Sequence, residues 1–211
     1  MTSVAEPGGP TWLATSLTDP LVKPMLRELG HEYSTRYGKD AHYELSHYPT
    51  EEFEPPHGAL LLLLEGGEPV AGGAFRRYDA TTAELKRIWT HSAHRRRGLA
   101  RRVVLELERV AVERGYHRVY LTTGPRQPEA RGLYLSTGYT PLFDTAADPE
   151  TIGPLPFEKR LPPLLPLSSP SSPPSPRASS PRAPSAPPAP VAVAAEPPVP
   201  APTATAVERK V

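Results

Sequence analysis

Apolar residues along the first 161 positions recur with helical spacing in some stretches and with strand spacing in others. After Leu99 they recur at i+4, i+5 and i+8, which predicts a helix from Gly98 to about Arg114. Residues 21–29 show similar spacing directly after Asp19-Pro20. Aspartate is favoured at a helix N-cap and proline at the first helical position, so a second helix is predicted there.

Three consecutive strands are predicted between these two helices. They are residues 59–64, 69–78 and 82–90, with a hairpin turn at Glu65-Gly66-Gly67-Glu68. In the third strand Ala83 and Leu85 alternate, but Ile88 follows Leu85 by three positions instead of two. One extra residue near Lys86-Arg87 is the pattern of a β-bulge.

The remaining segments complete a mixed architecture. We expect strands at 12–17, 119–122, 139–143 and 157–161, and helical segments at 32–37 and 128–137. Residues 38–57 are polar and predict a loop with one short helix. The order of elements indicates an α/β (α+β) fold, in which a mixed central sheet flanked by helices contains one strand–helix–strand unit.

The C-terminal 50 residues differ from the rest in composition. Residues 162–211 hold 16 of the 30 prolines, together with ten Ala and eight Ser, and contain no Gly or aromatic residue. Such a segment lacks the apolar bulk that offsets the entropy cost of ordering. We therefore expect a flexible arm at 1–10, a folded domain at 11–161 and a disordered tail at 162–211. Both an extended tether and an extension without function remain open for the tail.

Charge and cysteine content exclude several classes. The net charge is +1, from 24 Lys+Arg against 23 Asp+Glu, so no global basic field favours nucleic acid. The absence of cysteine excludes disulfides and a cysteine nucleophile. The longest apolar run is six residues, against the roughly 20 that a membrane helix needs. Because the first ten residues also lack the pattern of a signal peptide, we expect a cytoplasmic protein.

The most informative segment is Arg95-Arg96-Arg97-Gly98-Leu99-Ala100, which follows a strand and opens a helix. Free backbone N–H groups at a helix N-terminus form an anion site, and small residues let a phosphate approach the backbone. This pattern predicts a phosphate or pyrophosphate site, and the alternative is a solvated basic helix start. His91 and His94 have the spacing of a metal pair, but no acidic or cysteine ligand is near them in sequence, so we expect no metal.

The segment also matches the Gln/Arg-x-x-Gly-x-Gly/Ala signature of the GNAT acyltransferase superfamily. Residues 83–90 resemble the central bulged strand of that family, and residues 157–161 resemble its closing strand. Residues 129–139 resemble its Ala-x-x-Leu-Tyr helix, which ends at a Gly-Phe/Tyr pair. The resemblance spans about residues 11–161 and implies the GNAT acyl-CoA N-acyltransferase fold.

The resemblance implies an N-acetyltransferase that moves an acetyl group from acetyl-CoA directly to an amine acceptor in a ternary complex. It places the coenzyme A pyrophosphate and pantetheine arm against Ile88, Trp89, Thr90, Arg95, Arg96, Arg97, Gly98, Leu99, Ala100 and Gln127. Glutamine at 127 stands where the family often has asparagine, and Arg96 replaces a common glycine.

The resemblance also points to two catalytic side chains. Tyr134 matches the tyrosine that protonates the leaving thiolate, and Glu84 lies on the strand where many members place a general base. The alternatives are core packing for Tyr134 and an ion pair with Lys86 for Glu84. A non-catalytic acyl-CoA sensor of the same fold and a homodimer remain open. Nucleic-acid binding through the arginine run is disfavoured by the near-neutral charge of the domain.

Overall fold

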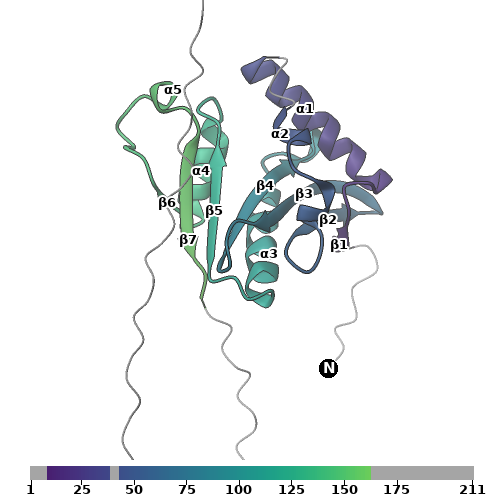
Figure 1. Ribbon diagram of the computed structural model, residues 1–211. Coiled ribbons are helices and arrows are strands. Elements are labelled where there is room, and N and C mark those ends of the chain that lie inside the picture. Colours follow the sequence, from purple (N-terminus) through teal and green to yellow (C-terminus); the bar gives the residue numbers. More distant parts are fainter. Residues whose placement is uncertain (1–8, 39–42, 163–211) are drawn as a thin grey trace, which may run out of the picture. The chain divides into compact units, whose positions relative to one another are not determined.

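The computed structural model describes residues 9–38 and 43–162, all within the first of two units, Met1–Ser168 (Figure 1). The predictions of a flexible arm and a disordered tail fall almost entirely outside the described residues. The expected loop at 38–57 is described except for residues 39–42.

Within the described residues, seven strands form one mixed sheet in the order β1-β2-β3-β4-β5-β7-β6. They are β1 Thr11–Thr15, β2 Ala59–Glu65, β3 Glu68–Arg77, β4 Thr82–Thr90, β5 Arg118–Thr123, β6 Thr140–Pro141 and β7 Leu155–Arg160. Neighbouring strands are antiparallel except β4 and β5, which run parallel. A parallel pair needs a crossover, and helix α3 (Leu99–Glu113) supplies it. The predicted α/β class and its strand–helix–strand unit are confirmed.

Helices cover both faces of the sheet. The α-helices are α1 Lys23–Tyr37, α2 Tyr43–Ser46, α3 Leu99–Glu113, α4 Pro128–Ser136 and α5 Pro149–Ile152, with short 3-10 segments at Pro20–Val22, Thr50–Phe53 and Ser92–His94. Asp19 caps the first of these segments, because its carboxylate accepts a hydrogen bond from the Leu21 N–H at 2.8 Å. The predicted helix start is therefore confirmed.

Strand β2 separates two apolar cores. Leu61 and Leu63 belong to a core with residues of α3, whereas Leu60 and Leu62 belong to a core with residues of α1. Since successive strand residues point to opposite faces, α1 and α3 cover opposite faces of the sheet. This explains why β2 is an unbroken apolar run: both of its faces are buried.

The predicted bulge in β4 is confirmed. Gly72 pairs with Trp89 and Ala74 pairs with Lys86, so β4 holds one more residue than β3 over this interval. The extra residue lets Arg87 adopt a φ of 58°. Gly73 lies opposite the bulge, and a Cβ there would stand 2.7 Å from Ile88 Cδ1 and 2.9 Å from Val103 Cγ1. The small Ala-Gly-Gly-Ala segment of β3 therefore makes room for the bulge and for α3.

Three elements differ from the predictions. The predicted helical segment at 32–37 is the second half of a continuous α1, since Gly30 and His31 do not interrupt the helix. The predicted strand at 139–143 is reduced to Thr140–Pro141, which pairs only with β7. Helix α5 was not predicted, because its four residues are too few to show a period. Asp148 nevertheless caps it by accepting from the Glu150 N–H at 3.0 Å.

Candidate active site

A cleft of about 990 Å³ opens where β4 and β5 separate. Their parallel pairing covers Thr82 to Glu84 on β4 and ends at the pair Glu84 and Tyr120. Beyond that point β4 stays paired with β3 and β5 stays paired with β7, so the two facing strand edges diverge. The backbone N–H and C=O groups of these edges are available to an extended ligand that carries amides.

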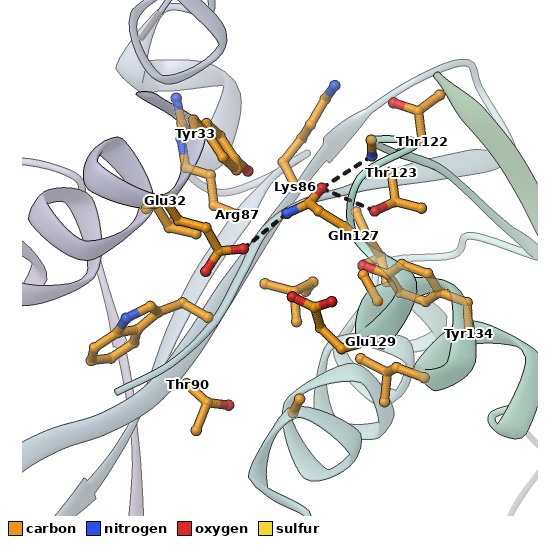
Figure 2. Close-up of a pocket in the computed structure, with 18 of the residues that line it drawn as sticks. Glu32, Tyr33, Lys86, Arg87, Thr90, Thr122, Thr123, Gln127, Glu129 and Tyr134 are labelled. Carbon is orange, nitrogen blue, oxygen red and sulfur yellow. Dashed lines mark hydrogen bonds between the residues drawn. The ribbon is translucent and has the colours of Figure 1, made fainter. Parts of the chain in front are cut away.

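One wall of the cleft is the second half of β4. Residues 85 to 90 all line it, including the predicted Ile88, Trp89 and Thr90. The Oγ1 atom of Thr90 is buried and has no hydrogen-bond partner among the described residues. A buried hydroxyl without a partner is costly, so this atom marks a place that a polar ligand group fits (Figure 2).

The outer end of the cleft is the loop that leads into α3. Of the predicted pyrophosphate residues, five line the cleft: Arg95, Arg96, Gly98, Leu99 and Ala100. Gly98 is the N-cap with a φ of 74° and caps the helix with no side chain, which leaves the first N–H groups of α3 free for an anion.

Arg96 and Arg97 differ in their roles at this loop. Arg96 has a φ of 61°, which costs a non-glycine residue about 1–2 kcal/mol. Strain of this kind gathers at functional sites, and Arg87 at the bulge is the other described non-glycine residue with positive φ. Arg97 is not among the residues that line the cleft. Its guanidinium holds the Glu65 carboxylate at 2.9 Å and keeps the pKa of that group below its usual range.

The opposite wall comes from α4 and carries Tyr134. The Tyr134 side chain is buried and packs against the rings of Tyr139 and Phe157. Burial raises the pKa of the phenol above its usual range, so the hydroxyl keeps its proton at neutral pH. Tyr134 therefore packs in the core, as the alternative expected, and it also lines the cleft.

Gln127 stands at the start of α4 and is fixed by three hydrogen bonds (Figure 2). Its Oε1 atom accepts from the Gly124 N–H at 3.0 Å and from the Thr123 hydroxyl at 3.2 Å. Its Nε2 atom donates to Glu32 Oε1 at 3.1 Å, which links α4 to α1. The longer glutamine thus reaches into the cleft from a fixed position.

Helix α1 contributes residues that the sequence reasoning missed. Leu29, Glu32, Tyr33 and Tyr37 all line the cleft. The spacing of Leu29, Tyr33 and Tyr37 at i, i+4 and i+8 was the available signal, since it places them on one face of the helix. No local signal showed that this face would lie over the cleft.

The C-terminal half of α1 is tied to the segment before α4 by contacts that we call the clasp. Arg36 donates to the Arg126 carbonyl and pairs with Glu129, and Arg126 Nη1 donates back to the Arg36 carbonyl at 2.9 Å. The Arg126 N–H donates to the Tyr37 hydroxyl at 3.1 Å. A Cβ at Gly124 would stand 1.9 Å from that hydroxyl oxygen, so any larger residue there would displace the Tyr37 side chain from the clasp.

Glu84 is buried at the point where the cleft begins, but it is not among the residues that line it. Its carboxylate pairs with Arg76 at 2.7 Å and with Lys86 at 3.1 Å. Arg76 in turn pairs with Glu52 at 2.8 Å. The expected pair with Lys86 is present, and Arg76 is a second partner that sequence reasoning did not anticipate. Its role as a general base stays a prediction.

Metal ligation and membrane insertion gain no support from the described residues. Within 9–38 and 43–162, no group of three or more His, Asp or Glu side chains is arranged to hold a metal ion. His91 instead lies 3.6 Å from Glu28, and His94 contacts Arg97. The helices in this part of the chain are too short or too polar to cross a membrane.

The cleft fits an anion joined to an extended chain that contains amides. The α3 N-terminus and Arg95 suit the anion, the open edge of β4 and the Thr90 hydroxyl suit the amides, and Tyr134 lies along the same cleft. Coenzyme A has this chemistry, with a pyrophosphate at one end and a pantetheine thiol at the other. The residues present therefore fit it.

Comparison with known proteins agrees with this geometry. The model of the Acetyltransferase (GNAT) family matches residues 23–139. An uncharacterized N-acetyltransferase of Bacillus subtilis, YsnE, is 34% identical over 107 residues, which is 48% of this chain and 71% of that protein. Human N-acetyltransferase 8 is 33% identical over 96 residues, which is 43% of this chain and 42% of that protein.

Solved structures share the fold. A Klebsiella pneumoniae protein assigned as an acyl-CoA N-acyltransferase has a TM-score of 0.57 and 25% identity, covering 72% of this chain and 97% of its own. The PaiA N-acetyltransferase of Thermoplasma acidophilum, solved with coenzyme A, has a TM-score of 0.52 and 14% identity, covering 72% and 99%. With the family model matching more than half of its residues, the chain belongs to the GNAT acetyltransferase family.

Proposed function

We propose that the chain transfers an acetyl group from acetyl-CoA to a primary amine. The observation that carries the proposal is the continuity of one cleft from the uncapped N-terminus of α3, along the unpaired edge of β4, to the buried hydroxyl of Tyr134. An anion site, a peptide-like groove and a proton donor follow one another in the order of the parts of acetyl-CoA.

The pyrophosphate binds at the α3 N-terminus in this proposal. The N–H groups of Leu99, Ala100 and Arg101 donate to it, and Arg95 adds a charge-assisted hydrogen bond. The pantetheine arm lies along β4, where its amides pair with the backbone of residues 88 to 90 and with the Thr90 hydroxyl. Gln127 contacts the arm from the opposite wall.

The reaction is a direct transfer. The neutral amine nitrogen attacks the thioester carbonyl carbon, the C–N bond forms, and the C–S bond breaks. The leaving sulfur takes a proton from the Tyr134 hydroxyl, and the nitrogen gives up its own proton to a base. Burial keeps Tyr134 protonated until the sulfur leaves, but the raised pKa also makes the phenol a weaker acid. The effect that favours the transfer is on the sulfur, because a thiolate in the same half-enclosed cleft is disfavoured and takes up a proton readily.

The candidate proton acceptor is Glu84, acting through water. Its position at the start of the cleft suits this role, although its carboxylate is already held by Arg76 and Lys86. The substitution Glu84→Gln distinguishes a general base from a structural ion pair. If Glu84 is the base, the variant should lose turnover and keep its affinity for acetyl-CoA. If Glu84 only forms ion pairs, the variant should lose stability and keep its turnover.

Calorimetry with coenzyme A and two matched variants tests the binding step. Arg95 and Arg97 lie two positions apart, but only Arg95 lines the cleft. We expect Arg95→Ala to weaken binding by about tenfold, because a hydrogen bond to a charged group is worth about 1.5–3 kcal/mol. Arg97→Ala should bind coenzyme A within about twofold of the wild type. The absence of any coenzyme A binding by the wild type would refute the proposed function.

Mass spectrometry of an amine library incubated with acetyl-CoA tests the transfer step. The library contains monoamines, polyamines, amino acids, an aminoglycoside and peptides with a free N-terminus. The expected result is a mass increase of one acetyl group on at least one member. Coenzyme A binding with no product from any member would instead favour a non-catalytic acyl-CoA sensor.

A further inference from the structure

Glu32 lies over the cleft and holds two residues that the proposed function assigns to the cosubstrate. Its Oε2 atom accepts from Arg95 Nη2 at 3.2 Å. Its Oε1 atom accepts from Gln127 Nε2 at 3.1 Å, and Figure 2 draws this second contact. Arg95 belongs to the proposed pyrophosphate site and Gln127 to the proposed pantetheine wall. The carboxylate of Glu32 therefore competes with acetyl-CoA for the same two donors.

The cosubstrate should win this competition. A pyrophosphate carries more charge than one carboxylate and matches the guanidinium of Arg95 in geometry. The amide of Gln127 gains an alternative acceptor in a pantetheine carbonyl. Glu32 would then keep Arg36, which lies 3.4 Å away but is shared with Glu129 and with the Arg126 carbonyl.

A carboxylate that loses its donors in a half-enclosed site attracts a new cation. The Glu32 side chain is 22% exposed, so water replaces the lost hydrogen bonds only in part. The acceptor amine is an ammonium ion in water before it reacts. Its positive charge is the group that the released carboxylate would bind best.

Resting on the proposed function, we propose that Glu32 binds the ammonium group of the acceptor once acetyl-CoA has drawn Arg95 and Gln127 away. The same site limits the acceptor to one positive charge on an apolar stem. In this role Glu32 binds the acceptor before the reaction, and the ammonium gives up a proton to water before its neutral nitrogen attacks the thioester.

The charged residues of the cleft are the reason to expect an acceptor with only one positive charge. The charged residues that line it are Glu32, Lys86, Arg87, Arg95, Arg96, Arg101 and Glu129. Cations outnumber the two carboxylates, and Glu129 is already paired with Arg36. A polyamine or an aminoglycoside would need several carboxylates, and the described lining residues offer Glu32 alone for it.

The apolar side chains around Glu32 are the reason to expect an apolar group attached to the acceptor amine. Leu29, Tyr33 and Tyr37 lie on the same side of α1 and line the same cleft. Leu133 and Pro154 line it as well, from α4 and from the segment before β7. An aryl or alkyl chain attached to the amine finds apolar contacts on these side chains.

The first measurement is the affinity of Glu32→Gln for coenzyme A by calorimetry. Removing the charge that competes for Arg95 should tighten binding by about two- to fivefold, the range of one partly exposed ion pair. Glu106→Gln is the matched control, because Glu106 is also held by an arginine but lies on α3 outside the cleft. That variant should bind coenzyme A as the wild type does.

The second measurement is acetylation kinetics with 2-phenylethylamine and spermidine as probes. The wild type should use 2-phenylethylamine with the higher kcat/KM. Glu32→Gln should raise the KM for 2-phenylethylamine by about tenfold, the cost of one hydrogen bond to a charge, with a smaller change in kcat. Glu32→Asp should recover part of the loss, whereas Glu106→Gln should show none.

The outcomes separate this inference from the proposed function. No coenzyme A binding by the wild type would refute both. Acetylation of 2-phenylethylamine with an unchanged KM in Glu32→Gln would leave the function standing and overturn the role of Glu32. Weaker coenzyme A binding by Glu32→Gln, a preference for spermidine, or coenzyme A binding with acetylation of neither probe would also overturn it.

Discussion

Tyr134 has one side chain with two roles, because its ring completes the core and its hydroxyl lies along the cleft. Tyr134→Phe removes the hydroxyl and keeps the ring. If the phenol protonates the leaving sulfur, turnover should fall by about 100-fold, the lower end of the range for a general acid. Acetyl-CoA affinity should change little. Steady-state kinetics and calorimetry give the two numbers, and equal turnover would remove Tyr134 from the reaction.

Some residues that line the cleft can be predicted from local sequence motifs. Others cannot, because contacts between residues far apart in sequence place them there. Gly98 could be placed from sequence because small residues at a helix start suit an anion, and Tyr134 could be placed because residues 129–139 resemble a helix of the family. Glu32 could not, because its partner Gln127 is 95 positions away and nothing near Glu32 indicates the meeting. Arg97 was expected at the pyrophosphate with its two neighbours. The structure turns it toward Glu65, which lies in a hairpin that no spacing rule brings to this loop.

Among the elements, α1 is anchored to the end of β4 by Glu28. Its carboxylate accepts from the Trp89 indole N–H at 3.0 Å, and from both the N–H and the hydroxyl of Ser92. Burial alone would raise the pKa of Glu28, but the hydrogen bonds from Trp89 and Ser92 together outweigh it and lower the pKa. The stabilisation is therefore present at neutral pH and is lost as pH falls through the lowered pKa.

Glu28→Gln should destabilise the protein more at pH 7 than at pH 4. At pH 7 the variant loses the charge that strengthens the three hydrogen bonds, at a cost of about 1–2 kcal/mol. Below pH 4.5, the ordinary pKa of glutamate, the unfolded chain takes up a proton more readily than native Glu28, whose pKa is lowered, so the difference shrinks as pH falls. Urea unfolding at the two pH values measures it. Glu51→Gln, at an exposed position, should change stability little at either pH, and an equal loss for Glu28→Gln at both would contradict the argument.

The bulge in β4 depends on the absence of a side chain at Gly73. Gly73→Ala would press a methyl group against Ile88, Val103 and Leu107, at 2.7 to 3.0 Å from their nearest carbons. Overpacking of this kind costs about 1–3 kcal/mol. Because Ile88 lines the cleft, coenzyme A affinity should fall as well. Urea unfolding and calorimetry measure the two effects.

Gly132→Ala is the matched control for that substitution. Gly132 lies in α4 with nothing within 4 Å of an added Cβ, so alanine should stabilise the helix by about 0.5–1 kcal/mol. A Gly73→Ala variant as stable as the wild type would mean that the bulge can form against a larger residue.

Elements with a strong period or a strong turn signal were predictable, and short ones were not. The bulged strand, the Gly66-Gly67 hairpin and α3 appear where the sequence predicts them, since each has a local physical cause. Strand β6 and helix α5 span two and four residues, and contacts with β7 and a single Asp148 cap define them. The clasp between α1 and the segment before α4 was out of reach for the same reason as Glu32, since it joins residues about 90 positions apart.

At the scale of the whole molecule, the folded domain is predicted to end at Leu161. Strand β7 ends at Arg160, and the Leu161 side chain is buried while its N–H donates to the His117 carbonyl at 2.8 Å. The family match at 23–139 lies well before this point. We therefore keep Leu161 as the predicted end of the domain.

Deleting residues 162–211 should leave both stability and activity unchanged. The midpoint of thermal unfolding should stay within about 2 °C, since 1 kcal/mol corresponds to about 2–4 °C at this size. The kcat/KM for a small amine should also be kept. A deletion that starts at Pro156 is the control: it removes most of β7, which pairs with β5 and β6, and should prevent folding. A fall in kcat/KM for the shorter deletion would show that the segment after Leu161 contributes to the acceptor site, and the domain boundary would have to move.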